Sequence, residues 1–208
     1  MMKLVLGIAL MMVAFSACTG YDPERYFEVV PNDGGSSVRI VRYVGTNWEV
    51  RIPSRIRNLP VTHIGSEAFR NRNLINVTIP NSVTVIGREA FSENHLTNVT
   101  IPNSVTVIGH GAFAKNQLAS VIISNNVTVI EEWTFFANQL TDITIPNNVA
   151  IIGDFAFNSN KLNSVTIGEG VIRIGYAAFE GNEFASITIP INAFEDSSFD
   201  PGVTVTRR

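Results

Sequence analysis

The sequence lacks most of the features on which chemically active proteins depend, and each absence removes a class of function. The 208 residues include one cysteine, Cys18, so neither an internal disulfide nor a thiolate metal cluster can form. Charged residues make up only 16% of the chain, and fifteen Lys and Arg stand against eighteen Asp and Glu without a basic run. Nucleic-acid binding requires such a basic footprint, so neither DNA nor RNA is expected as a partner.

Long apolar runs are also lacking, and the twelve-residue run from Leu4 to Phe15 is too short to span a bilayer as a helix. It follows Lys3 and leads through two small residues into Cys18, which predicts a signal peptide over residues 1–17. The order Phe-Ser-Ala-Cys resembles a bacterial lipobox, although Phe15 stands where leucine is commonest. The resemblance implies a lipid on Cys18, a tether over residues 18–25 and membrane anchoring on the outer surface of a bacterial cell. Plain secretion with a free cysteine is the alternative, as is a periplasm-facing location.

A 22-residue repeat dominates the rest of the chain. Its phenylalanine column recurs six times, at Phe69, Phe91, Phe113, Phe135, Phe157 and Phe179. Columns of leucine, valine and isoleucine keep the same interval, and the leucine column ends in Phe184. Such a unit cannot bury its apolar face alone, so neighbouring units must stack into one continuous core. The repeat predicts a β-rich solenoid.

Each unit contains two stretches in which β-branched and polar residues alternate with a period of two, which is typical of short half-buried strands. In one unit, Pro102 ends the first stretch and Gly109 closes the second, where we expect a corner with positive φ. The phenylalanine then follows in a tight turn. Five asparagines at the 22-residue interval lie where one coil turns into the next, and we interpret them as structural. They are Asn94, Asn116, Asn138, Asn160 and Asn182.

The two ends depart from the repeat and are expected to form caps. Strand-like runs over residues 26–30, 38–44 and 48–52 predict an N-terminal β cap over residues 26–57, before six leucine-rich repeats over residues 58–190. The next phenylalanine, Phe194, arrives early, which predicts a truncated repeat and a C-terminal cap over residues 191–208. The tail Val203 to Thr206 is expected to cover the last coil, with Arg207 and Arg208 discouraging pairing with another chain.

The unit Leu-x-x-Val-x-Ile-Pro-x-x-Val-x-x-Ile-Gly-x-x-Ala-Phe, unbroken from Leu96 to Phe113, resembles the BspA-like, treponemal-type leucine-rich repeat. The resemblance begins at Val50 and covers most of the chain. Where the family typically carries a cysteine, three positions after the phenylalanine, this chain has asparagine in five units and Arg72 in the first. The resemblance implies a bacterial surface protein, with adhesion to host matrix or to other cells as an expected role.

Few residues of the sequence are candidates for catalytic or metal-binding groups. His63, His95 and His110 occupy three different columns, so we expect exposed, structurally neutral histidines and no metal site. The least regular coil carries Glu131, Glu132, Trp133 and Phe136. Its two acidic residues are either a paired-carboxylate site or a solvated charged turn, and we favour the turn. Neither a metal nor a cofactor is expected.

The outward residues of the first strand form the candidate binding face. They are Asn76, Thr78, Asn98, Thr100, Ser120, Ile122, Asp142, Thr144, Ser164, Thr166, Ser186 and Thr188. Threonine is favoured on exposed strands by its β-branching alone, so this composition also has a purely structural explanation. The functional interpretation is a broad surface that hydrogen-bonds a protein partner or accepts an added strand.

Three functions follow in order of preference. The first is a lipid-anchored, non-enzymatic surface protein that uses the solenoid to recognise a protein ligand. The second is a membrane-proximal scaffold for an envelope assembly, which the short tether favours. The third is a solenoid polysaccharide-active enzyme, which should cluster charged residues on one strand face, whereas Asp142 is the only charged member of the twelve.

Overall fold

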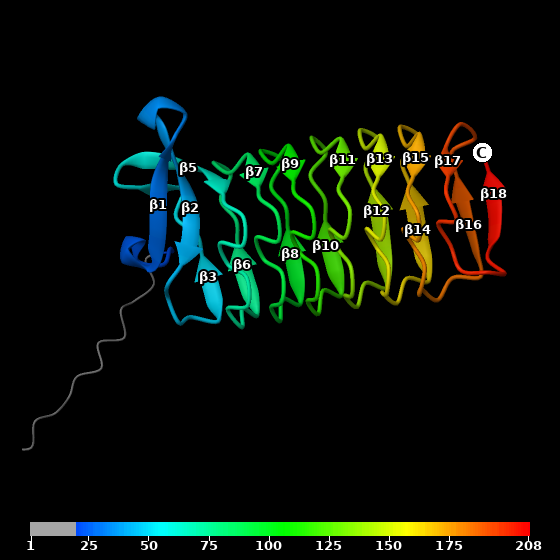
Figure 1. Cartoon of the computed structure of the whole chain (residues 1–208), viewed down its shortest axis with the longest axis horizontal. Coiled ribbons are helices and arrows are strands. Elements are labelled where there is room, and N and C mark those ends of the chain that lie inside the picture. The colour runs from blue at the N-terminus through cyan, green and yellow to red at the C-terminus, as the bar shows by residue number, and fades with distance from the viewer. Residues whose placement is uncertain (1–19) are drawn as a thin grey trace, which may run out of the picture.

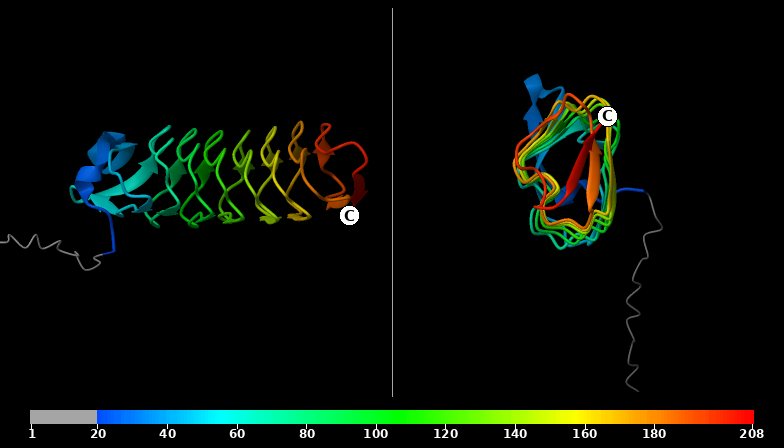
Figure 2. Two further views of the ribbon diagram at one scale, coloured as in Figure 1. Left: turned by 90° about the horizontal axis from the view of Figure 1, so that it is seen from below. Right: turned by 90° about the vertical axis from the view of Figure 1, so that its right-hand side faces the viewer.

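The computed structural model describes residues 20–208, and they wind into a single solenoid. Short strands lie in two rows along its length (Figure 1). Viewed down the long axis, the successive coils superimpose as a flattened oval (Figure 2). Helix is limited in the described residues to two 3-10 turns, η1 (Glu24–Tyr26) and η2 (Asp33–Gly35). The predicted β-rich solenoid of stacked coils is confirmed.

The N-terminal cap is built from the three strands that the sequence predicted. β1 (Phe27–Asn32) and β2 (Ser37–Tyr43) form an antiparallel hairpin, while β3 (Glu49–Arg51) pairs in parallel with the first repeat strand. β4 (Arg55–Ile56) and β5 (Leu59–Ile64) follow, and β2 pairs in parallel with β5. The hairpin therefore continues the sheet of the solenoid and closes its first coil.

The first row contains one strand from each coil. Its members are β6 (Asn76–Thr78), β8 (Asn98–Thr100), β10 (Ser120–Ile122), β12 (Asp142–Ile145), β14 (Ser164–Ile167), β16 (Ser186–Ile189) and β18 (Thr204–Arg207). They pair in parallel two by two, as β3 with β6, β8 with β10, β12 with β14 and β16 with β18. Each strand turns its central β-branched residue toward the core, where it is buried or half-buried, and its flanking residues outward, because successive side chains of a strand point to opposite sides.

The second row is more continuous. It contains β7 (Val85–Ile86), β9 (Val107–Ile108), β11 (Val129–Ile130), β13 (Ile151–Ile152), β15 (Arg173–Ile174) and β17 (Phe194–Glu195). One sheet runs from β1 through β5 and β7 to β9, and a second runs from β11 to β17. The row is therefore interrupted once, between β9 and β11.

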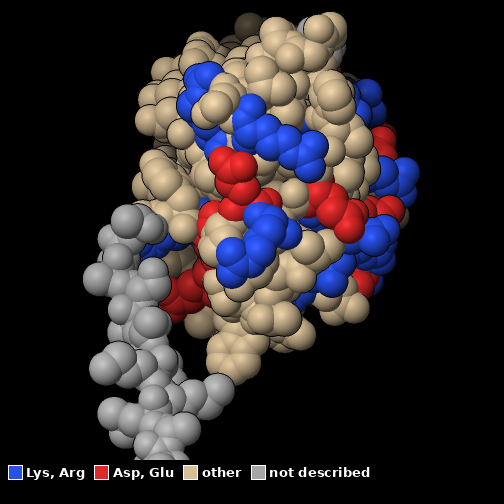
Figure 3. All heavy atoms as spheres, turned by 90° about the vertical axis from the view of Figure 1, so that its left-hand side faces the viewer, with Lys and Arg blue, Asp and Glu red and all other residues tan. Residues whose placement is uncertain are grey.

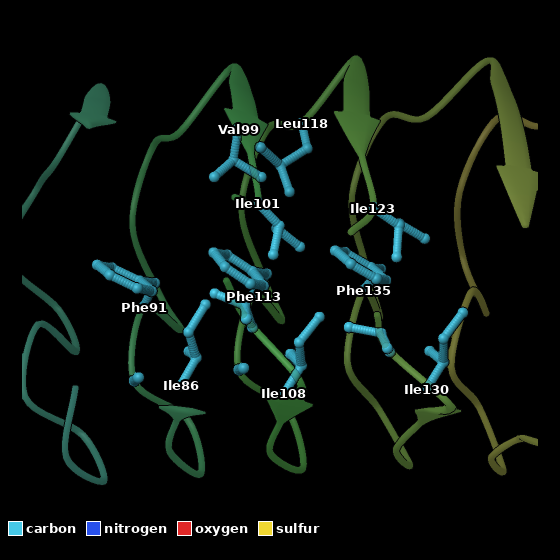
Figure 4. Close-up of a cluster of buried hydrophobic side chains, with 14 of the residues drawn as sticks. Ile86, Phe91, Val99, Ile101, Ile108, Phe113, Leu118, Ile123, Ile130 and Phe135 are labelled. Atoms are coloured by element: carbon cyan, nitrogen blue, oxygen red, sulfur yellow. The ribbon is translucent and has the colours of Figure 1, made fainter. Parts of the chain in front are cut away.

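A ladder of stacked rings runs through the core. The phenylalanine column is fully buried, and adjacent rings from Phe69 to Phe179 lie 5.0 to 5.7 Å apart with interplanar angles of at most 22°. Figure 4 shows three of these rings in parallel, each beside at least one isoleucine of its own coil. Burial of one such ring contributes roughly 1.5–3 kcal/mol, so the ladder is a major source of stability.

The ladder has a further rung at each end. Tyr43 stacks on Phe69 at 5.3 Å, and burial raises the pKa of its phenol to about 12. Phe199 stacks on Phe179 at 5.7 Å, whereas Phe194 is 64% exposed. The expectation that Phe194 is the next member of the column was wrong, because β17 places it at the outward position that Arg173 holds in the coil before. The six 22-residue coils are thus flanked by irregular ones, giving about eight turns.

The asparagine column forms a second internal ladder, as predicted. In each of the five, Nδ2 donates to the phenylalanine carbonyl of its own coil and to that of the coil before. Oδ1 accepts the backbone N–H of the preceding coil's leucine at 2.9 to 3.1 Å. A buried carbonyl or amide left without a partner is costly, so these side chains lock adjacent turns together.

The corner glycines are required for a reason other than the expected one. Gly109 does not have a positive φ; instead, a Cβ there would lie 2.7 Å from the backbone nitrogen of Arg88 in the coil before. The same close approach holds at Gly87 and Gly153. The left-handed residues lie nearby, two positions before and two after each phenylalanine, as at Gly111 and Lys115.

Glu131 occupies this corner position in the fourth repeat and explains the interruption of the second row. The amides of Gly109 and Gly153 each donate to an isoleucine carbonyl of the coil before, at 2.8 Å. Within residues 20–208, the corresponding bond from Glu131 to Ile108 is missing. A side chain does not fit against the neighbouring backbone at this corner, so β9 and β11 separate. The gap between Phe113 and Phe135, 5.7 Å, is the widest between Phe69 and Phe179.

The C-terminal tail covers the last coil, as expected, because β18 pairs with β16. Its two arginines also bond to the solenoid itself. Arg207 donates to the carbonyl of Ala193 at 2.6 Å, and Arg208 binds the carbonyl of Ile167 and the carboxylate of Glu169. Both side chains therefore fasten the tail to the solenoid.

Candidate binding surfaces

The strand face, defined as the twelve outward residues of β6 to β16, is a continuous surface along the first row. Eleven of the twelve side chains are exposed, and Thr188 is half-buried because its hydroxyl lies 2.8 Å from that of Thr206. Six strands at about 4.8 Å spacing make a surface about 25 Å long. The structure therefore presents these residues together, on one side of the molecule.

The chemistry of the strand face is neutral and polar, with one apolar exception. Ile122, in the middle of the face, is 65% exposed, and Asp142 beside it is the one carboxylate of the set. Shallow hollows of about 290 and 300 Å³ lie between β6 and β8 and between β10 and β12, where adjacent strands are not paired. This surface offers hydrogen-bonding groups but no nucleophile with a neighbouring base.

The irregular coil carries its two glutamates on the surface. Glu131 and Glu132 are both exposed, and Glu132 lies 3.7 Å from the imidazole Nδ1 of His110. Trp133 and Phe136 contact each other at 4.5 Å, and Trp133 also stacks on Phe155 at 4.4 Å. The coil is therefore an aromatic cluster beside a charged corner.

A hollow beside this cluster was not predicted from the sequence. We call it the slot; its volume is about 230 Å³. It is lined by Arg70, Glu89, Ser92, Glu93, His110, Gly111, Ala114, Lys115, Trp133 and Phe136. These residues belong to four successive turns, at positions just before and after the ladder phenylalanine. A comparison of these positions between successive repeats could have predicted the slot, because Gly111 and Ala114 are smaller than the residues at the same positions in the next repeat.

The charged side of the slot is an ion-pair network. Arg70 contacts Glu89 at 2.5 Å and Glu93 at 2.9 Å, and Lys115 contacts Glu93 at 3.4 Å. The hydrogen bond from Arg70 lowers the pKa of Glu93 and raises that of Arg70 itself. Basic and acidic side chains also lie side by side over the N-terminal end of the molecule (Figure 3). The charges in this part of the protein largely neutralise one another.

The three histidines differ in their surroundings, and not all of them are exposed as expected. His63 has a structural role, because its half-buried ring lies 2.7 Å from Asn32 Nδ2 and 2.9 Å from the Thr62 hydroxyl. His95 is exposed, and His110 lines the slot. Among residues 20–208, no group of three or more His, Cys, Asp and Glu side chains is placed to hold a metal ion.

The predicted lipidation site, Cys18, lies outside the described residues, as does the predicted signal peptide. From Gly20 to the C-terminus, no helix has the length and apolar character needed to cross a membrane.

Comparison with known families decides where the repeat belongs. The profile "BspA type Leucine rich repeat region" matches six copies, over residues 62–186 and 137–201. The chain belongs to this family. BspA-type repeats generally form non-enzymatic scaffolds for protein–protein interaction. The strand face and the slot are thus two surfaces of a BspA-type solenoid.

Solved structures give the same fold. One is the leucine-rich repeat protein of T. pallidum (TpLRR), with 22% identity and a TM-score of 0.50, over 89% of this chain and 86% of that one. Another is a leucine-rich repeat protein from Bacteroides ovatus, with 18% identity and a TM-score of 0.51, over 88% of this chain and 66% of that one. No curated protein sequence matches this BspA-type chain significantly.

Proposed function

We propose that this BspA-type protein recognises another protein through the strand face, as a binding scaffold without catalytic activity. The observation that supports the proposal is the extent of the face, in which eleven of twelve outward side chains are exposed over six coils. The β-branched residues between these side chains belong to the core or pack against it. A rigid surface binds with little loss of conformational entropy, which favours affinity.

The proposed location is the outer surface of a bacterial cell, and the proposed ligand is a host matrix or cell-surface protein. Proteins of this family are typically bacterial surface proteins, which supports the location. Fibronectin, fibrinogen, laminin and whole cells are the ligands to test first. Saturable binding to at least one supports adhesion, and binding to none of them contradicts it.

A matched pair of double variants tests whether the strand face carries the binding. Thr100→Arg with Thr144→Arg places two charges on the strand face, and Thr106→Arg with Thr128→Arg places two exposed charges elsewhere on the coils. An unpaired charge in a neutral interface is unfavourable, so the first pair should weaken binding by at least about tenfold. The second pair should leave it unchanged. Equal losses in both proteins would place the interface elsewhere.

We further propose that a lipid on Cys18 anchors the protein, with the N-terminal cap toward the membrane. Metabolic labelling with a palmitate analogue should mark the wild-type protein but not Cys18→Ala. Labelling of neither protein would leave plain secretion as the explanation.

The second candidate function is a membrane-proximal scaffold, and the short predicted tether favours it. Only residues 19–25 separate Cys18 from the cap, a reach of at most about 25 Å. Protease treatment of intact cells separates the two functions. Digestion is expected for a surface adhesin, and protection until the envelope is opened is expected for an internal scaffold.

A further inference from the structure

The slot results from one absent and one short side chain in the same coil. Gly111 and Ala114 stand two positions before and one position after the ladder ring Phe113. The same positions hold Glu89 and Ser92 in the coil before, and Trp133 and Phe136 in the coil after. The hollow is therefore about one coil wide, with its floor at Gly111 and Ala114.

One wall of the slot is a flat aromatic surface. Trp133 stacks on Phe155 at 4.4 Å and 22°, which covers one face of the indole. The neighbouring coil on its other side is that of Gly111, which has no side chain, so the second face borders the hollow. Phe136 packs edge-on against the indole at 70° and extends this wall. The slot lies where a side chain at position 111 would continue the stack of Phe155 and Trp133 by one coil.

The opposite wall is polar. The Glu89 side chain leans over the floor, since its Cγ lies 3.2 Å from where a Cβ of Gly111 would stand, and it is only 19% exposed. Arg70 holds the Glu89 carboxylate at 2.5 Å. Lys115 and His110 complete the lining. A ligand in the slot thus meets an apolar plane on one side and hydrogen-bonding groups on the other.

The charges of the lining select a neutral ligand. Two basic residues, Arg70 and Lys115, are paired with two acidic residues, Glu89 and Glu93. A cationic ligand would have to displace these bases from the carboxylates, and an anionic ligand would have to displace the carboxylates from the bases. A flat ring with two apolar faces would displace water from this charged wall without replacing the hydrogen bonds of that water, which is unfavourable.

We propose that the slot binds a neutral pyranose ring of a saccharide. The apolar C–H face of the sugar stacks on Trp133, and its hydroxyls accept from Arg70 and Lys115 and donate to the Glu89 carboxylate. Hydrogen bonds to charged groups are stronger than neutral ones. The volume of about 230 Å³ is below the roughly 300–1,000 Å³ of drug-sized sites, which suits a single ring. This site is separate from the strand face and does not depend on protein binding there.

Intrinsic fluorescence provides a direct assay, because the chain contains two tryptophans and Trp48 is 66% exposed in the cap. In the Trp48→Phe protein, Trp133 is the sole tryptophan. The probes are cellotetraose, mannotetraose, maltotetraose and galactotetraose, with N-acetyl-tyrosine amide and N-acetyl-lysine amide as peptide side-chain probes. We expect a saturable change in Trp133 emission with at least one of the four saccharides.

The variant Ala114→Phe fills the slot with a ring of the protein's own. It is preferable to substitution of Gly111, whose φ of +60° strains other residues, and Phe136 shows that this position accepts phenylalanine in the next coil. Loss of an anchoring contact should reduce saccharide affinity by about tenfold or more. The matched control is Glu180→Phe, an exposed residue at the same position three coils away, which should bind like the parent protein.

Circular dichroism and thermal unfolding must first show that each variant is folded. Saccharide binding that Ala114→Phe abolishes and Glu180→Phe retains supports the proposal. No saturable response to any saccharide up to about 10 mM, well above a millimolar Kd, overturns it. A response to an amide probe alone overturns it too, by showing that the slot takes a peptide side chain. Binding that survives Ala114→Phe places the saccharide elsewhere and also overturns it.

Discussion

The strand face and the phenylalanine turn belong to the same 22-residue unit but differ in how far their outer residues vary. On the strand face, each coil presents similar short polar side chains, from Asn76 to Thr188. At the turn, the residues beside the buried ring change from a charged network around Arg70, through Gly111 and Ala114, to the cluster at Trp133. The buried phenylalanine and asparagine hold the turn in place. The outer residues next to them can therefore differ in charge and size from one coil to the next.

The largest effect should come from the ring ladder beneath the turn. Phe113→Ala leaves a cavity between two stacked rings and should lower the free energy of unfolding by about 3–5 kcal/mol. Urea unfolding followed by circular dichroism measures it. The control is Phe194→Ala, whose ring is 64% exposed and should cost less than about 1 kcal/mol. Equal losses would mean that the stacked column is not the core of the fold.

The asparagine ladder should give the next largest effect. Asn116→Ala removes the partners of buried carbonyls and of the Leu96 amide, and should cost about 2–3 kcal/mol. Asn98→Ala, on the strand face, should change stability by less than about 0.5 kcal/mol because that side chain is exposed. Thermal unfolding of both variants compares the two regions directly. A larger loss at Asn98 would reverse the distinction drawn between them.

A smaller effect is expected at the interrupted corner. Glu131→Gly removes the side chain that separates β9 from β11 and so permits the missing amide hydrogen bonds. The flexibility that glycine adds to the unfolded chain opposes part of this gain in stability. We expect a net stabilisation of about 1 kcal/mol in urea unfolding. Glu132→Gly, one residue away and exposed, should not stabilise the protein. Destabilisation by Glu131→Gly would show that Glu131 does not cause the break.

The smallest effect concerns pH. The hydrogen bond from Arg70 depresses the pKa of Glu93, so the stabilisation from this pair is present above the ordinary glutamate pKa of about 4.3. It is lost as the pH falls through the lower pKa of the folded state. The difference in Tm between wild type and Glu93→Gln should be small at pH 7, because water screens the pair, and should vanish in strong acid. A difference that grows on acidification would contradict this sign.

Most of the scaffold was predictable from the sequence because it depends on columns. Stacked neighbours place residues 22 apart side by side, so one period yields the ring ladder, the asparagine ladder and the outward strand residues. The end rungs were not predictable, since Tyr43 and Phe199 lie 26 and 20 residues from their neighbours and not 22. Their positions depend on how the cap and the tail fold onto the last coils.

The slot was missed for a different reason. Its floor consists of a glycine and an alanine, which draw no attention in a search for chemical groups. It becomes visible only when the outer turn positions of adjacent coils are compared, Glu89 with Gly111 and Gly111 with Trp133. The corner glycines also depend on a contact between adjacent coils. The backbone of the coil before requires them, and no local turn rule describes that contact.

The second row of strands is broken at one junction, between the coils of Phe113 and Phe135, and amide hydrogen exchange tests this central claim most directly. Residue-resolved exchange should show a fast amide at Glu131, whereas the corner amides of Gly87, Gly109, Gly153 and Gly175 are protected by their bonds to the coil before. In Glu131→Gly, the amide at position 131 should become as slow as the others. Uniform protection along all five corners of the wild-type protein would contradict the claim.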